Sequence, residues 1–130
     1  MRAATLAMMQ RYDVRPPEPR LRSAKFSGGN QQKLVLAREA FPQPRVLLVG
    51  QPTRGVDIGA IEFIHKRLVA MRDAGKAVLV VSVELDEILS LCDRILVMFD
   101  GHLTGELAQT EADERKVGLL MAGVTDREAA

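Results

Sequence analysis

The 130-residue sequence has one cysteine, one tyrosine, no tryptophan and almost no excess of either charge. A single cysteine, Cys92, excludes an intramolecular disulfide, which needs cysteines in pairs. The net charge of +1 gives no basic field for unspecific binding of nucleic acid or anionic lipid. No apolar run approaches the roughly 20 residues of a membrane-spanning helix. The two histidines, His65 and His102, lack the spacing of metal ligands, so we expect no metal site.

Apolar residues make up 47% of the chain, enough to predict a packed core. Two valine-rich runs, 46–49 and 77–82, are typical of strands that are covered on both faces. Apolar residues recur between them at helical spacing, which predicts a helix that Gly75 would end. These are Ile58, Ile61, Ile64, Leu68 and Met71. The order strand, helix, strand predicts a βαβ unit with parallel strands.

Other elements are expected on both sides of this unit. Prolines prevent a helix in the basic stretch 13–25, so we interpret it as a solvated loop in preference to a binding patch. The remaining expectations are helices at 3–11, 30–41, 84–92 and 111–122, a third strand at 94–99 and a hairpin turn at Asp100-Gly101.

One short stretch suggests a ligand. In "FSGGNQQK", residues 26–33, Gly28 and Gly29 allow close backbone approach immediately before a helix. Free amides and the helix dipole favour an anion there, and Ser27 can cap the helix or donate its hydroxyl to a phosphate oxygen. Taken alone, the stretch is equally consistent with a plain turn before a surface helix.

The order of several motifs along the chain is more specific than this single stretch. "FSGGNQQK" is followed by strand 46–49, "PTRGVD", "LVVSVELDEI" and "CDRILVM". This order resembles the C-terminal part of an ATP-binding-cassette (ABC) ATPase domain. The stretch "QPTRGVDIGAIEFIHK" is similar to the second nucleotide-binding half of sugar- and nucleoside-import ATPases, and closest to the nucleoside branch.

The resemblance implies an α/β fold. It would be a partial P-loop NTPase domain with a parallel βαβ core, part of the helical signature subdomain and a C-terminal hairpin and helix. The expected divisions are an N-terminal helix and loop at 1–26, the ATPase part at 27–122 and a tail at 123–130.

The resemblance also assigns a site. "SGGNQQK" would be the signature motif, which contacts an ATP held by a complementary nucleotide-binding half. The implied contacts are Ser27, Gly28, Gly29, Asn30 and Gln31. Asp57, at the D-loop position, would lie at the same interface.

Three catalytic positions of the family are altered. Gly50 stands where the Walker B aspartate would be, Gln51 where the catalytic glutamate would be, and Val83 where the switch histidine would be. No catalytic group is therefore intact. Replacement by Asp86 or Glu87 is the weaker alternative, because both are expected on the solvated face of a helix.

No Walker A loop is found. The pair Gly75-Lys76 follows a helix instead of opening one, and the residues around it do not fit G-x-x-x-x-G-K-[ST]. We therefore expect a fragment that is inactive in isolation, with ATP and Mg²⁺ bound only in an assembled complex.

The function implied is that of an ATP-binding module of a nucleoside or sugar importer, peripheral on the cytoplasmic face of the membrane. Its partners would be a complementary nucleotide-binding half and membrane-spanning permease subunits, without nucleic acid. An exposed sheet edge predicts self-association. The alternatives are a soluble, non-transport ATPase of the same family and a structural or regulatory remnant.

Overall fold

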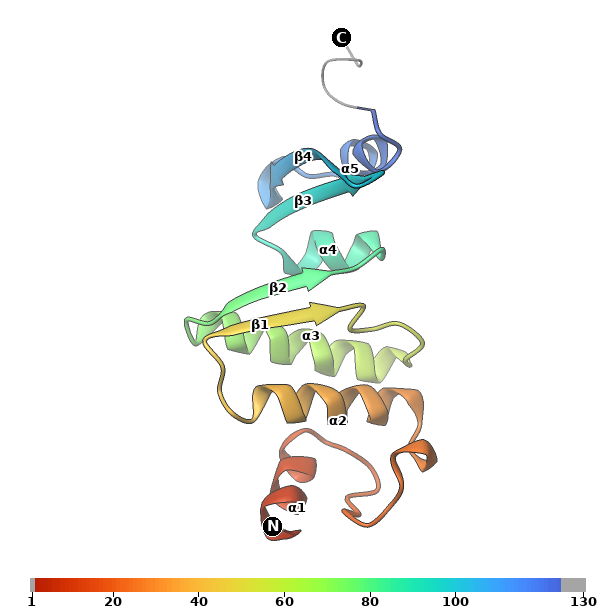
Figure 1. The fold of residues 1–130 in the computed structure, drawn as a ribbon, viewed down its shortest axis with the longest axis vertical. Helices are drawn as coiled ribbons and strands as arrows, with labels where there is room; N and C mark the ends of the chain where they lie inside the picture. Colours follow the sequence, from red (N-terminus) through yellow and green to blue (C-terminus); the bar gives the residue numbers. More distant parts are fainter. Residues whose placement is uncertain (1, 125–130) are drawn as a thin grey trace. The chain divides into compact units, whose positions relative to one another are not determined.

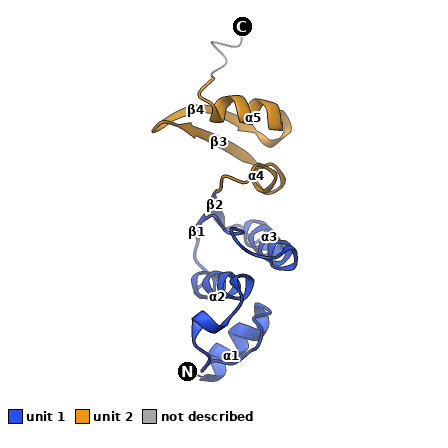
Figure 2. Cartoon of the chain, turned by 90° about the vertical axis from the view of Figure 1, so that its right-hand side faces the viewer, with its two compact units in different colours: residues 1–81 blue, residues 82–130 orange. Residues whose placement is uncertain are grey.

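The computed structural model describes residues 2–124. The chain divides into two compact units, with the boundary between Val81 and Ser82 (Figure 2). We call residues 1–81 unit 1 and residues 82–130 unit 2 and describe each by itself.

Unit 1 contains three helices and a parallel pair of strands (Figure 1). In chain order they are α1 (Arg2–Arg11), the short 3₁₀ turn η1 (Ser23–Lys25), α2 (Gly28–Ala40), β1 (Val46–Gly50), α3 (Ile58–Asp73) and β2 (Ala77–Val81). The two strands pair in parallel from Val46↔Ala77 to Gly50↔Val81, and α3 connects them. The predicted βαβ unit is confirmed.

The helices of unit 1 pack on one another and on one face of the strands, with contacts of α1 to α2, α2 to α3 and α3 to β2 (Figure 1). Buried apolar side chains come from all of these layers, among them Met9, Val14, Leu36, Ala37, Leu47, Ala60, Ile64 and Leu68. Of the predicted apolar face of α3, Ile64 and Leu68 are buried. Ile58, its first residue, is largely exposed.

The prediction that both strands are covered on both faces is wrong. Burial alternates along β1 and β2, and Leu48 is 73% exposed. Because residues two apart point to the same side of a strand, the exposed side chains form one apolar sheet face. This face consists of Val46, Leu48, Leu79 and Val81.

Unit 2 is a helix, an antiparallel hairpin and a second helix. Its elements are α4 (Leu85–Leu91), β3 (Arg94–Phe99), β4 (His102–Ala108), the 3₁₀ turn η2 (Gln109–Glu111) and α5 (Glu114–Met121). The hairpin turns at Asp100-Gly101, where both residues have positive φ as a type I′ turn requires. Ile95 and Val97 of β3 pack with Val117 and Leu120 of α5.

The third strand does not extend the parallel sheet. In the described chain β3 pairs with β4, in a sheet separate from β1 and β2. Two helix boundaries also differ from expectation because of capping side chains. Ser27 caps α2, which begins at Gly28, and Asp113 caps α5, which begins at Glu114.

Candidate functional site

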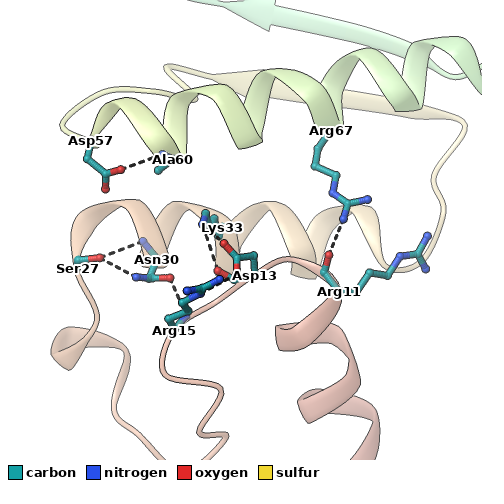
Figure 3. A network of polar contacts seen from close by, with 9 residues as sticks. All are labelled: Arg11, Asp13, Arg15, Ser27, Asn30, Lys33, Asp57, Ala60 and Arg67. Carbon is teal, nitrogen blue, oxygen red and sulfur yellow. Dashed lines mark hydrogen bonds and ion pairs between the residues drawn. The ribbon is translucent and has the colours of Figure 1, made fainter.

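The candidate site is the start of α2. Ser27 is the N-cap, and its Oγ accepts hydrogen bonds from the backbone N–H of Asn30 at 3.4 Å and from the Asn30 side-chain Nδ2 at 2.9 Å (Figure 3). The Oδ1 of Asn30 accepts the backbone N–H of Arg15 at 2.8 Å. The side chain of Asn30 thus joins the cap of α2 to a segment 15 residues earlier in the chain.

The first amides of α2 are the donors of this site. In a helix the first N–H groups have no acceptor in the preceding turn. Here the N–H of Asn30 is capped by Ser27, and the N–H of Gln31 donates to the Ser27 carbonyl at 2.9 Å. The amides of Gly28 and Gly29 come before these two hydrogen-bonded N–H groups in the helix. Together with the Ser27 hydroxyl they form a group of donors that suits an anion.

The glycine pair is required by close packing. Both glycines lie in the helix without a positive φ, so conformational freedom is not the reason for them. A Cβ at Gly29 would lie 2.7 Å from both Ala60 Cβ and Asp57 Oδ2, and a Cβ at Gly28 would lie 2.9 Å from the Gly55 carbonyl oxygen. Only glycine lets α2 approach the loop before α3 this closely.

Asp57, the residue at the predicted D-loop position, lies beside this start of α2. It is the N-cap of α3, where its Oδ1 accepts the N–H of Ala60 at 2.9 Å (Figure 3). Its other oxygen, Oδ2, is the atom that a Cβ at Gly29 would meet. The two motifs "SGG" and "GVD" are therefore in direct contact.

The altered catalytic positions belong to other elements of the chain. Gly50 is the last residue of β1, and Gln51 follows with φ +50° and donates its N–H to the Val81 carbonyl at 2.7 Å. Both are at the carboxyl end of a parallel strand, where α/β proteins bind ligands. Val83 belongs to unit 2 and is exposed.

Sequence analysis missed a polar cluster beneath the site. The largely buried Lys33 Nζ donates to the Asp13 carboxylate at 3.0 Å and to the Asp13 carbonyl at 3.2 Å (Figure 3). Hydrogen bonds from Lys33, and next from Arg15, lower the pKa of Asp13. The Lys33 ammonium also lies 4.8 Å from the centre of the Phe63 ring.

A second cation fixes the same segment. The Arg67 guanidinium lies over the rings of Tyr12 and Phe63. It also donates to the Arg11 carbonyl at 2.6 Å (Figure 3). The stretch 13–25, interpreted as a solvated loop, is therefore packed near its start: Val14 is buried, as is Tyr12 immediately before the stretch. Its later basic residues are exposed, as expected. Only the place of Lys33 at the end of "SGGNQQK" could have drawn attention to this cluster.

Other titratable groups were assigned surface places. Asp86 is exposed, but Glu87 is buried, so its expected place on a solvated face is wrong. His65 is half-buried on α3 and His102 is exposed at the start of β4. Within residues 2–124 no group of three His, Cys, Asp or Glu side chains could hold a metal ion. None of the helices in that range combines the length and hydrophobicity needed to cross a bilayer.

Solved structures show the fold. A dimeric ATP-binding cassette bound to ADP and inorganic phosphate superposes with a TM-score of 0.71 at 26% identity, covering 83% of this chain and 46% of that one. A nucleotide-free cassette from an ABC transporter gives a TM-score of 0.72 at 20% identity, over 92% and 46%. The fold is that of an ABC ATPase domain, over part of its length.

Sequence relatives agree. No protein-family model matches the chain. It is 50% identical over 123 residues to the guanosine import ATP-binding protein NupO of Bacillus subtilis, and 50% identical over 116 residues to the nucleoside import ATP-binding protein NupA of Lactococcus lactis. Its homologues are ATP-binding proteins of nucleoside and sugar importers. These two alignments cover 95% and 89% of this chain but 24% and 23% of the relatives, so the chain spans about a quarter of their length.

Proposed function

We propose that the chain is the signature-bearing part of the ATP-binding subunit of an ABC importer, which couples ATP binding and hydrolysis to uptake of a nucleoside or sugar. The 50% identity to guanosine- and nucleoside-import proteins favours a nucleoside. In this role the chain works with a complementary nucleotide-binding half and membrane-spanning permease subunits, peripheral on the cytoplasmic face of the membrane.

The observation that carries the proposal is the group of donors at the start of α2. The Ser27 hydroxyl and the amides of Gly28 and Gly29 would contact the γ-phosphate of an ATP that the complementary half holds. Asn30 and Gln31 complete the turn that carries these donors, and Asp57 would lie at the same interface. A helix N-terminus stabilises an anion by about 0.3–2 kcal/mol, too little to hold ATP without the other half.

The chain's own catalytic positions do not support hydrolysis at its own site. Gln51 has an amide that can orient a water molecule but cannot take its proton, and a general base contributes roughly 10²–10⁴ in rate. Gly50 and Val83 offer no side-chain ligand for a metal ion or phosphate. ATP and Mg²⁺ would therefore be bound productively only in the assembled complex, at the site that the signature completes.

The experiment is the substitution Ser27→Ala in a hybrid. The hybrid is the guanosine import ATP-binding protein of Bacillus subtilis, with its matching segment replaced by this whole chain and its permease present. A hydrogen bond to a charged group is worth about 1.5–3 kcal/mol, so we expect Mg·ATP turnover and guanosine uptake to fall at least tenfold. The control is Lys66→Ala, which removes an exposed bond to Glu62 on α3. Equal activities of Ser27→Ala and the parent hybrid would contradict the proposal and favour a structural remnant.

A further inference from the structure

The orientation of the Asn30 amide is dictated by its neighbours. The backbone N–H of Arg15 can only donate, so the atom that faces it at 2.8 Å must be the carbonyl oxygen Oδ1 (Figure 3). The donor Nδ2 then points at Ser27 Oγ, 2.9 Å away. Ser27 Oγ therefore accepts this hydrogen bond and cannot donate its own proton to Asn30.

The Ser27 hydroxyl has its acceptor capacity filled. A hydroxyl offers two lone pairs and one proton. The lone pairs accept from the Asn30 Nδ2 and from the Asn30 backbone N–H. The proton is then left to point away from Asn30, and Ser27 can act toward a ligand only as a donor. Fully ionised phosphate oxygens only accept, so this polarity matches an anion.

The acceptor Asn30 Oδ1 is itself held by a fixed partner. We call residues 11–15 the anchor segment. Val14 is 1% exposed and donates its N–H to the Met9 carbonyl at 2.9 Å. Just before Val14 in the chain, Lys33 binds Asp13, and Arg67 donates to the Arg11 carbonyl. These contacts fix the Arg15 N–H without help from any ligand.

We propose that Asn30 is a positioning residue: through the anchor segment it presets the Ser27 hydroxyl as a hydrogen-bond donor toward an anion at the start of α2. This inference rests on the proposed function, because the anion is the γ-phosphate that Ser27 is proposed to contact. Asn30 itself does not touch the phosphate through its side chain, whose two polar atoms are used within the chain.

The substitution that separates anchoring from presetting is Asn30→Asp. A carboxylate still accepts the Arg15 N–H, so the anchor segment stays attached. The carboxylate has no N–H to donate to Ser27, so the Ser27 hydroxyl donates its proton to the carboxylate. The direction of the hydrogen bond between residues 27 and 30 is thereby reversed. In the full chain we expect slow hydrogen exchange of the Arg15 amide in the parent and in Asn30→Asp, and exchange at least tenfold faster in Asn30→Ala. Equal exchange rates of this amide in Asn30→Ala and in the parent would refute the claim that Asn30 is attached to the anchor segment.

Activity is measured in the hybrid with Mg·ATP, as a double-mutant cycle of Ser27→Ala and Asn30→Asp. We expect each single change to lower turnover at least tenfold, and Asn30→Asp to change turnover less than threefold once Ser27 is alanine. Near-normal turnover of Asn30→Asp beside a defective Ser27→Ala would overturn the inference and leave the proposed function standing. Additive losses would show that the new charge or residue 30 itself acts on the nucleotide, and would also overturn it. A fully active Ser27→Ala would refute the proposed function instead.

Discussion

Replacing Gly29 by alanine tests whether the glycine pair serves packing. The new Cβ would lie 2.7 Å from Ala60 Cβ and from Asp57 Oδ2. Ala60 is fully buried on α3, and Asp57 caps that helix, so neither atom retreats without moving α3. Overpacking costs about 1–3 kcal/mol, against a gain of up to about 1 kcal/mol for alanine over glycine in a helix. We expect a net loss of about 1 kcal/mol in the stability of unit 1, the difference of these two terms.

The matched control is Gly118→Ala in α5, where a Cβ would meet no atom within 4 Å. This variant should gain about 0.5–1 kcal/mol, because alanine has less backbone entropy to lose. The assay is native-state hydrogen exchange, read on α2 and α3 for unit 1 and on β3 and α5 for unit 2, since compact units can open separately. Stabilisation of α2 by Gly29→Ala would refute the packing argument. A bulkier change such as Gly29→Glu is a poor test of phosphate contact, because its side chain would first collide with Asp57.

Three further predictions concern the whole chain. Because hydrogen bonds lower the pKa of Asp13 below its ordinary value of 3.8, the stability that its ionised form contributes is present above that value and lost as pH falls through the folded pKa. In urea unfolding, the loss of unfolding free energy that Asp13→Asn causes relative to the parent should therefore become smaller in acid. A loss that stays constant down to pH 2 would contradict this. The exposed apolar face and the unpaired edges of β1 and β2 in the described chain predict self-association. Light scattering should show that Leu48→Lys reduces it, and a monodisperse parent chain at high concentration would contradict the prediction. Calorimetry of the isolated chain with Mg·ATP should give no micromolar binding, and a micromolar dissociation constant would mean that the chain holds phosphate by itself.

Local sequence signals were sufficient for most elements of the fold. The valine-rich runs, the helical spacing from Ile61 to Met71 and the Asp100-Gly101 turn each act over a few residues, and the corresponding elements formed. Strand coverage was not predictable in the same way. An apolar run such as 46–49 has the same pattern whether one or both faces are packed, and only the placement of the helices decides. Leu48 is exposed because the helices of unit 1 cover the opposite face.

The site shows the same difference between local features, which the sequence predicts, and contacts between distant residues, which it does not. Ser27 was predicted as a possible cap, because a cap needs only the residue and the helix that follows it. Asp57 was predicted only as the D-loop residue, and its capping of α3 was learned from the structure. The contacts of Lys33 with Asp13, and of Asn30 with Arg15, join positions 20 and 15 residues apart. No periodicity links such pairs, and nothing in the composition of the proline-rich stretch separates its packed first residues from its exposed remainder. The resemblance supplied the motif but not what supports it.

In the proposed function, the packing at the start of α2 explains how the chain can contact a nucleotide without catalytic groups of its own. The donors at the start of α2 are backbone amides and one hydroxyl, and they are held by Asn30 and by the loop that carries Gly55 and Asp57. None of these contacts involves the side chain of Gln51, and Gly50 has no side chain. In the proposed function, the absence of carboxylates at Gly50 and Gln51 therefore leaves the chain's own site without a base and a metal ligand but does not move the start of α2. The proposed contact of the helix start with a nucleotide that is held elsewhere needs no group at the end of β1, because the supports of the helix start lie in the anchor segment and in the cap of α3.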